Sequence, residues 1–186
     1  MITTLLLLGF VLCATATDLA RHKIYNRTTY TGIVVAVVFS TAGALLSGTC
    51  MDEDRLHRLG WIPISECVLG LLICGFVMLF CFVMIKVGGG DVKLIAMLGA
   101  FLGPEQGITA MLWTFVLGAC MCLIVLVWRT GPLQTAALAF RRIAYAFAPL
   151  YFRPLTDQEH YQLQPTLFLA PSTLMAVVIV RFSIIP

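Results

Sequence analysis

Long apolar runs without a charged side chain constrain this chain more than any other feature. The stretches from Ile2 to Thr17 and from Tyr30 to Gly48 contain no Asp, Glu, Lys or Arg. Hydrophobic residues make up 60% of the chain and charged residues 11%, whereas a soluble domain usually carries about 25% charged residues. Such a chain lacks the polar surface that a water-soluble fold requires. The pattern therefore predicts a protein embedded in a lipid bilayer.

The length indicates one domain over residues 1–186, and the apolar pattern predicts an all-α integral membrane bundle of about six transmembrane helices. The predicted segments are Ile2–Thr17, Tyr30–Gly48, Ile62–Ile85, Val92–Gly103, Gly107–Trp128 and Thr166–Ile185. A spanning helix needs about 20 residues, so the fourth segment, which ends before Pro104, is too short to cross alone. Gly99 and Gly103 form a GxxxG pair, which predicts close contact with a neighbouring helix.

The distribution of basic residues between the loops predicts the orientation of the chain. With six crossings, the residues that fall on one side are Arg21, Lys23, Arg27, Lys86, Lys93, Arg129, Arg141, Arg142 and Arg153. The residues on the other side are Arg55, Arg58 and Arg181. Because Lys and Arg accumulate in cytoplasmic loops, we place the larger group in the cytoplasm and the loop Thr49–Trp61 outside.

Two segments have more than one interpretation. Residues 130–164 form the longest polar connection, and Leu133–Phe152 within it mixes aromatic residues with arginines, which favours a cytoplasmic loop with an interfacial helix. That helix would serve either as a membrane anchor or in substrate docking. The run Ala14-Thr15-Ala16 is similar to a signal-peptide cleavage site, but the chain begins without the usual positive residues. We therefore expect the first segment to be retained, with cleavage as the alternative.

No cluster in the sequence predicts a metal or a cofactor. Most of the seven cysteines lie in apolar runs and no CxxC pair occurs, so we interpret them as small packing residues. His22, His57 and His160 are scattered, and no Ser or Cys lies in a recognisable nucleophile motif. The net charge of +3 is too weak and too scattered to indicate a nucleic-acid partner.

Asp18 and Asp91 are the candidate catalytic residues. Asp18 directly follows the first apolar segment, and Asp91 opens the fourth segment after a run of three glycines. The predicted topology brings both to the cytoplasmic end, where an ionisable group is costly unless it is paired or hydrated. Two nearby carboxylates can share one proton, so that one takes a proton from water while the other donates to the scissile carbonyl. The glycines would let the backbone approach a substrate strand closely.

Each acid also has a structural interpretation. Asp is common at helix starts, where Asp91 could simply act as a cap. Asp18 could be a helix-end residue that faces Arg21 or Lys23. The joint placement of the two acids at one membrane depth favours the catalytic interpretation over either structural one.

Two short elements resemble those of a known family. Residues 88–94 read Gly-Gly-Gly-Asp-Val-Lys-Leu and are similar to the GxGDxKL element of the type IV prepilin peptidases. Residues 18–26 resemble the family's first element, in which an Asp is followed by a basic stretch and then by Ile-Pro-Asn. Asn26 lies at the family's spacing from Asp18, but Tyr25 replaces the usual proline. The resemblance extends over nearly the whole chain through the number of segments and the positions of both acids.

The resemblance implies an aspartic endopeptidase of the bacterial cytoplasmic (inner) membrane, with Asp18 and Asp91 as its catalytic acids. It would remove the short basic leader peptides of prepilins or pseudopilins at the cytoplasmic face, without a metal or cofactor. The supporting residues that match the two motifs are Gly88, Gly90, Lys93 and Asn26. The chain lacks the paired CxxC motifs of the longer methylating relatives. It is similar to the short, peptidase-only type associated with tight-adherence (Flp) pili.

Two other classes of function stay open at the level of sequence. A small transporter or channel subunit would use Asp18 and Asp91 as ion or proton sites and would carry polar residues in several membrane helices. The second, fifth and sixth predicted segments contain no acidic residue, which counts against this interpretation. A non-catalytic subunit of a pilus assembly machine would differ only in its lack of activity.

Overall fold

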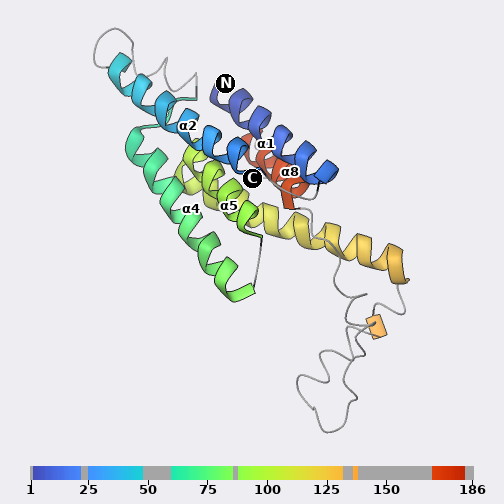
Figure 1. The fold of residues 1–186 in the computed structure, drawn as a ribbon. Coiled ribbons are helices and arrows are strands. Elements are labelled where there is room, and N and C mark those ends of the chain that lie inside the picture. Colours follow the sequence, from blue (N-terminus) through green and yellow to red (C-terminus); the bar gives the residue numbers. More distant parts are fainter. Residues whose placement is uncertain are drawn as a thin grey trace. The chain divides into compact units, whose positions relative to one another are not determined.

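The computed structural model describes residues 2–21, 25–47, 60–85, 88–131, 136–137 and 169–182. The helices are α1 (Ile2–Arg21), α2 (Asn26–Ser47), α4 (Ile64–Ile85), α5 (Gly89–Thr130) and α8 (Leu169–Arg181). No strand occurs in these described ranges, and the all-helical class predicted from the sequence is confirmed (Figure 1).

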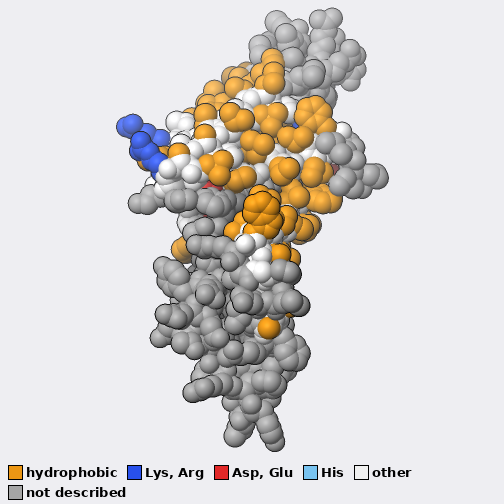
Figure 2. All heavy atoms as spheres, turned by 90° about the vertical axis from the view of Figure 1, so that its right-hand side faces the viewer, with side chains coloured by type: hydrophobic (Ala, Val, Ile, Leu, Met, Phe, Trp, Pro, Cys, Tyr) orange, Lys and Arg blue, Asp and Glu red, His pale blue; other side chains and the backbone are white. Residues whose placement is uncertain are grey.

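Among the described residues, four helices, α1, α2, α4 and α5, are long and apolar enough to cross a membrane. The apolar helix α8 is shorter, with 13 residues. Large apolar side chains lie on the outside of these helices, and Leu5, Leu45 and Phe76 are 69%, 75% and 73% exposed. Figure 2 shows hydrophobic side chains over most of the described surface on one face, with basic side chains at its edge. The protein is therefore a helical membrane protein, whereas the count of about six crossings stays a prediction.

The chain divides into two compact units, residues 1–117 with 168–186 and residues 118–167. In the second unit, the structure describes the last part of α5 and residues 136–137. The predicted interfacial helix in residues 130–164 lies almost wholly outside the described residues, as does most of the loop Thr49–Trp61. The packing and the candidate site described below all belong to the first unit.

The first two helices extend beyond the predicted segments. Helix α1 continues to Arg21 rather than ending at Thr17, so Asp18 lies in its last turn and not after the helix. Helix α2 begins at Asn26 rather than at Tyr30. Hydropathy detects only the apolar part of a helix, whereas polar residues at its ends can continue the same backbone hydrogen bonds. The correction matters because it gives Asp18 a defined face on α1.

Helix α5 consists of two arms that meet at Gly103, whose φ is 77° and ψ is −179°. Pro104 disfavours the helical conformation of the preceding residue, and glycine accepts a positive φ without steric cost. The first arm corresponds to the short predicted segment and begins at Gly89 rather than at Val92. After the break the chain turns back, since a Cβ on Gly107 would lie 3.1 Å from the Gly99 Cα atom.

The first arm of α5 lies at the centre of the first unit. Its side chains Leu94, Ile95, Met97 and Leu98 are all 0% exposed. Leu94, Met97 and Leu98 belong to one core cluster, whose members from other helices are Leu7, Val11 and Ala14 of α1, Ala36 of α2, Cys67 of α4, and Ala170 and Val177 of α8. Ile95 belongs to a second cluster with Cys74 and Met78 of α4. A segment too short to cross a bilayer alone is thus enclosed by the other helices instead of facing lipid.

Glycines mediate the contact between α4 and α5. A Cβ added to Gly70 would lie 2.1 Å from the Gly99 carbonyl oxygen and 2.9 Å from the Gly103 Cα atom. A Cβ on Gly75 would lie 3.4 Å from the Cβ atom of Ala96 one turn before Gly99. The predicted GxxxG pair therefore lies at a helix contact, where small residues let two backbones approach closely.

Helix α8 packs antiparallel to α1 (Figure 1). The Thr15 hydroxyl donates to the Ala170 carbonyl over 3.1 Å. At the other end, Arg181 Nε donates to the Thr4 hydroxyl over 2.7 Å. The start of α8 consequently lies beside the last turns of α1, the part of α1 that carries Asp18.

Candidate active site

Asp18 lies on the buried face of α1. The buried residues of this helix are Thr3, Leu7, Val11, Ala14 and Asp18, which follow the helical period and share one stripe. Asp18 is 8% exposed. The apolar stripe that packs α1 into the core therefore also directs a carboxylate into the protein and away from lipid. A buried ionisable group in a membrane protein is costly and marks a candidate functional residue.

Asp91 lies in the first turn of α5, where it is half-buried. Its backbone N–H donates to the Gly88 carbonyl over 3.0 Å, and its carboxylate accepts a hydrogen bond from the Gly88 backbone N–H. The acid thus occupies the third helical position and reaches back to the capping residue, the second half of a capping box. The structural interpretation from the sequence put Asp91 at the N-cap of the helix. In the structure, Gly88 occupies the N-cap instead.

Gly88 permits this arrangement because it has no side chain. A Cβ at position 88 would lie 2.9 Å from the Asp91 Oδ2 atom, closer than real Cβ contacts occur. A Cβ at Gly89 would meet only the Phe82 ring at 3.9 Å. Gly88 therefore lets the Asp91 carboxylate reach the Gly88 backbone N–H. Gly90, the other glycine of the motif, is half-buried in the same turn.

The structure brings Asp18 and Asp91 together. Their carboxylates lie close enough to repel each other electrostatically, although they come from helices separated by most of the first half of the chain. Helix α1 ends and helix α5 begins at the same end of the first unit. Mutual repulsion disfavours the state in which both carboxylates are ionised, so that one of them can hold a proton while the other is charged. One acid and one base are then available at one place, which is the requirement for general acid–base hydrolysis.

Lys93 and Asn26 contact each other and not the acids. The Lys93 ammonium donates to Asn26 Oδ1 over 2.9 Å and lies 4.9 Å from the centre of the Tyr30 ring. Two residues along a helix point about 200° apart, so Lys93 faces α2 while Asp91 faces the other carboxylate. The two motifs are therefore joined physically, through one hydrogen bond.

Tyr25, at the position where the first motif usually has a proline, lies immediately before α2. Its carbonyl accepts from the Thr28 backbone N–H over 3.1 Å. Its hydroxyl accepts a hydrogen bond from Arg21 Nη1 over 2.6 Å, and the Arg21 guanidinium carbon lies 5.8 Å from the centre of the ring. The aromatic side chain thus links the last turn of α1 to the first residues of α2.

Tyr30 was missed by sequence reasoning. It follows Asn26 by four residues, so the two side chains share one face of α2, and this spacing is the signal that could have identified it. Other carboxylates of the described part lie elsewhere, with Glu66 in the first turn of α4 and Glu105 just after the break of α5. Within the described ranges, no three His, Cys, Asp or Glu side chains are grouped as metal ligands would be.

Comparison with known proteins adds one finding. A family model described as the type IV leader peptidase family matches residues 5–123 of the 186-residue chain. The match includes Asp18 and Asp91, together with Asn26, Gly88 and Lys93. Comparisons with curated proteins and with solved structures gave no significant match.

Proposed function

Because this chain belongs to the type IV leader peptidase family and is thus a membrane peptidase, we propose that it is an aspartic endopeptidase that cleaves prepilins or pseudopilins. Its catalytic acids are Asp18 and Asp91. It removes a short basic leader peptide and leaves the rest of the precursor in the membrane. The observation that carries this proposal is the close approach of two carboxylates from different helices, one buried and one in a helix's first turn.

The two acids hydrolyse the peptide bond by sharing one proton. The ionised carboxylate takes a proton from water, and the oxygen of that water attacks the scissile carbonyl carbon. The protonated carboxyl donates its proton to the carbonyl oxygen. When the tetrahedral intermediate collapses and its C–N bond breaks, the proton held by the first acid passes to the departing amine. One hydroxyl of the intermediate returns a proton to the second acid as the C=O bond re-forms. The products are a free leader carboxylate and a new amino terminus, and the acids return to their starting state.

The distribution of basic residues supports a proposal for the side of the membrane on which the site lies. Arg21 and Arg27 lie at the end of the first unit that carries both acids, and basic residues accumulate on the cytoplasmic side of membrane proteins. We therefore place the reaction at the cytoplasmic face of the bacterial inner membrane. The substrate is a small membrane-anchored precursor with a basic leader. The 186-residue sequence contains no CxxC pair of the kind found in the methylating relatives, and we propose a peptidase-only activity like that of the members associated with tight-adherence (Flp) pili.

The test is co-expression of the chain with a prepilin that carries a basic leader, followed by mass measurement of the pilin. The wild type should release the leader, whereas Asp18→Asn and Asp91→Asn should each leave the precursor uncut. Asparagine keeps the shape of the side chain but cannot exchange a proton at neutral pH. Glu105→Gln, which neutralises an exposed carboxylate elsewhere on α5, is the matched control and should cleave normally.

Three outcomes would contradict the proposal. Normal cleavage by a well-folded Asp91→Asn protein would exclude the two-acid mechanism. Ion movement with no proteolysis by the wild type would support a transporter that uses the acids as ion sites. Pilus assembly that depends on the chain but is equally supported by both Asn variants would identify a non-catalytic assembly subunit.

A further inference from the structure

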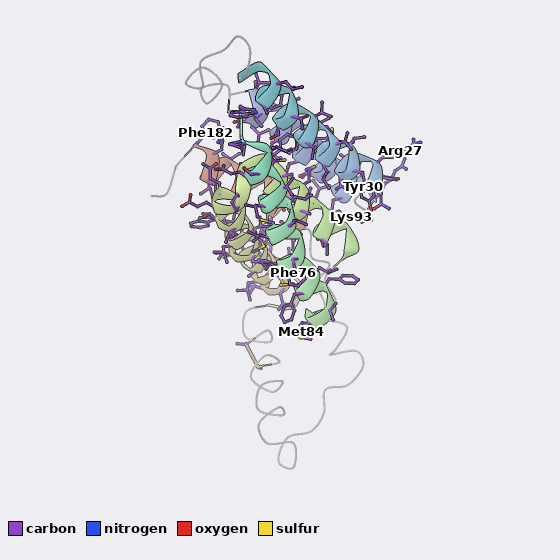
Figure 3. The ribbon with its side chains drawn as sticks, turned by 90° about the vertical axis from the view of Figure 1, so that its left-hand side faces the viewer. Arg27, Tyr30, Phe76, Met84, Lys93 and Phe182 are labelled. Atoms are coloured by element: carbon purple, nitrogen blue, oxygen red, sulfur yellow. The ribbon has the colours of Figure 1, made fainter. Side chains whose placement is uncertain are left out.

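A cluster of three side chains joins the start of α2 to the start of α5. Lys93 donates to Asn26 Oδ1 over 2.9 Å and lies 4.9 Å from the centre of the Tyr30 ring. Asn26 and Tyr30 are four residues apart and present one face of α2 to the ammonium. Figure 3 shows Lys93 beside Tyr30, whereas the neighbouring Arg27 projects away from the helices. The charged groups of Lys93 and Arg27 therefore have different surroundings, one against α2 and the other away from the helices.

The contact is specific in its chemistry. An ammonium group is a donor only, and the amide oxygen of Asn26 is an acceptor. The face of the Tyr30 ring carries partial negative charge and attracts the same cation. A lysine that only extends towards lipid headgroups would instead direct its charge out of the protein, as Arg27 does. Lys93 is half-buried and turns to α2.

Through a series of contacts, the cluster of Lys93, Asn26 and Tyr30 links the part of α5 that carries Asp91 to the part of α1 that carries Asp18. Lys93 lies two residues after Asp91, in the same first turns of α5. Asn26 lies at the start of α2, which is linked to the last turn of α1 by the Arg21–Tyr25 hydrogen bond of 2.6 Å. Asp18 lies in that last turn. The geometry thus connects Asp91 through Lys93 and the start of α2 back to the other acid.

We propose that Lys93 is a positioning residue: by holding Asn26 and Tyr30 it sets the first turn of α5, and with it Asp91, at the correct place relative to Asp18. The inference rests on the proposed function, since it assigns a role within that reaction. This role works through Asn26 and Tyr30, which Lys93 contacts, and requires no contact with the scissile bond or the attacking water. A displacement of about 1 Å in a catalytic group can reduce the rate by roughly 100-fold, so loss of this contact should act on turnover.

The test measures kcat and KM of leader cleavage for purified variants in the same lipid or detergent. Lys93→Met and Asn26→Leu remove the contact from opposite sides, and each should lower kcat by about 10- to 100-fold with KM nearly unchanged. The double variant should be no slower than the slower single variant, because both changes break one contact. Lys93→Arg, which can still donate to Asn26 and lie on the ring, should retain most of kcat.

Arg27→Met is the matched control, since it removes a cation beside the cluster that projects away from it. It should leave kcat and KM unchanged. If Lys93→Met does not fold, Asn26→Leu decides the question by itself, because Asn26 is exposed and its loss leaves the core intact.

The outcomes separate this inference from the proposed function. An increased KM with normal kcat in Lys93→Met would show a substrate contact and overturn the positioning role. Wild-type cleavage together with full activity of Asn26→Leu would overturn the positioning role alone. If the wild type cleaves no prepilin, the proposed function itself fails and the role assigned to Lys93 fails with it.

Discussion

Gly99 of α5 faces Gly70 of α4 so closely that a Cβ on Gly99 would lie 2.2 Å from the Gly70 carbonyl oxygen. The atoms nearest to such a Cβ are backbone atoms, which cannot rotate out of the way as a side chain can. The contact lies in the buried arm of α5, whose N-terminal end carries Asp91. Helices α4 and α5 can therefore approach this closely only because Gly99 has no Cβ atom.

Gly99→Ala should therefore destabilise the protein by roughly 1–3 kcal/mol, the usual cost of overpacking. The measurement is the unfolding midpoint in detergent, with the yield of folded protein from membranes as a second readout. Gly9→Ala is the matched control, because a Cβ on Gly9 meets nothing within 4 Å. Equal and small effects of both changes would show that α4 and α5 do not pack through these glycines.

Gly88→Ala should reduce cleavage without unfolding the protein. The new methyl group would lie 2.9 Å from the present position of Asp91 Oδ2 and would displace the carboxylate from its backbone donor. We expect kcat to fall about 10-fold or more, because a misplaced catalytic group loses orientation. Gly89→Ala adds the same methyl group one residue later, where its nearest neighbour is 3.9 Å away, and should remain active. An active Gly88→Ala variant would show that the carboxylate tolerates a different position.

The double variant Asp18→Asn/Asp91→Asn should cleave hardly more slowly than either single variant. Each acid has a separate task in one proton exchange, so loss of either already stops the reaction, and effects within such a unit are strongly non-additive. Residual cleavage is measured for the two single variants and the double variant at equal amounts of membrane protein. Multiplicative losses would show that the acids act independently and not as a pair.

Tyr25→Phe should retain most activity, whereas Tyr25→Leu should lose several-fold more. Phenylalanine removes the 2.6 Å hydrogen bond to Arg21 but keeps a ring for the guanidinium, and leucine removes both interactions. The measurement is kcat for the two variants, with the amount of folded protein as the control. Full activity of Tyr25→Leu would mean that the Arg21 contact does not hold the corner between α1 and α2.

Much of the fold could be predicted from the sequence. The apolar runs identify the membrane helices, because a helix that spans lipid must be apolar along its whole length. Gly103 and Pro104 predict where α5 breaks, because proline excludes the helical conformation of the residue before it. The last turn of α1 and the first turn of α2 were missing from the predicted segments, because the polar residues in these turns have no hydropathy signal.

The sequence also indicated Asp18 and Asp91 as candidate site residues, since charged residues are rare in this chain and each one at a helix end stands out. Their catalytic role stays a prediction. Which faces of the helices meet was decided only by the tertiary structure. In α4, Met78 is buried and Phe76 is exposed, yet both side chains are apolar. Met78 packs against protein and Phe76 lies on the surface that lipid covers, and both environments favour apolar side chains. Hydropathy therefore cannot tell an inner face from an outer one. The rotation of each helix, the pairing of Gly70 with Gly99 and the contact of Lys93 with Asn26 follow instead from close packing between segments far apart in the chain.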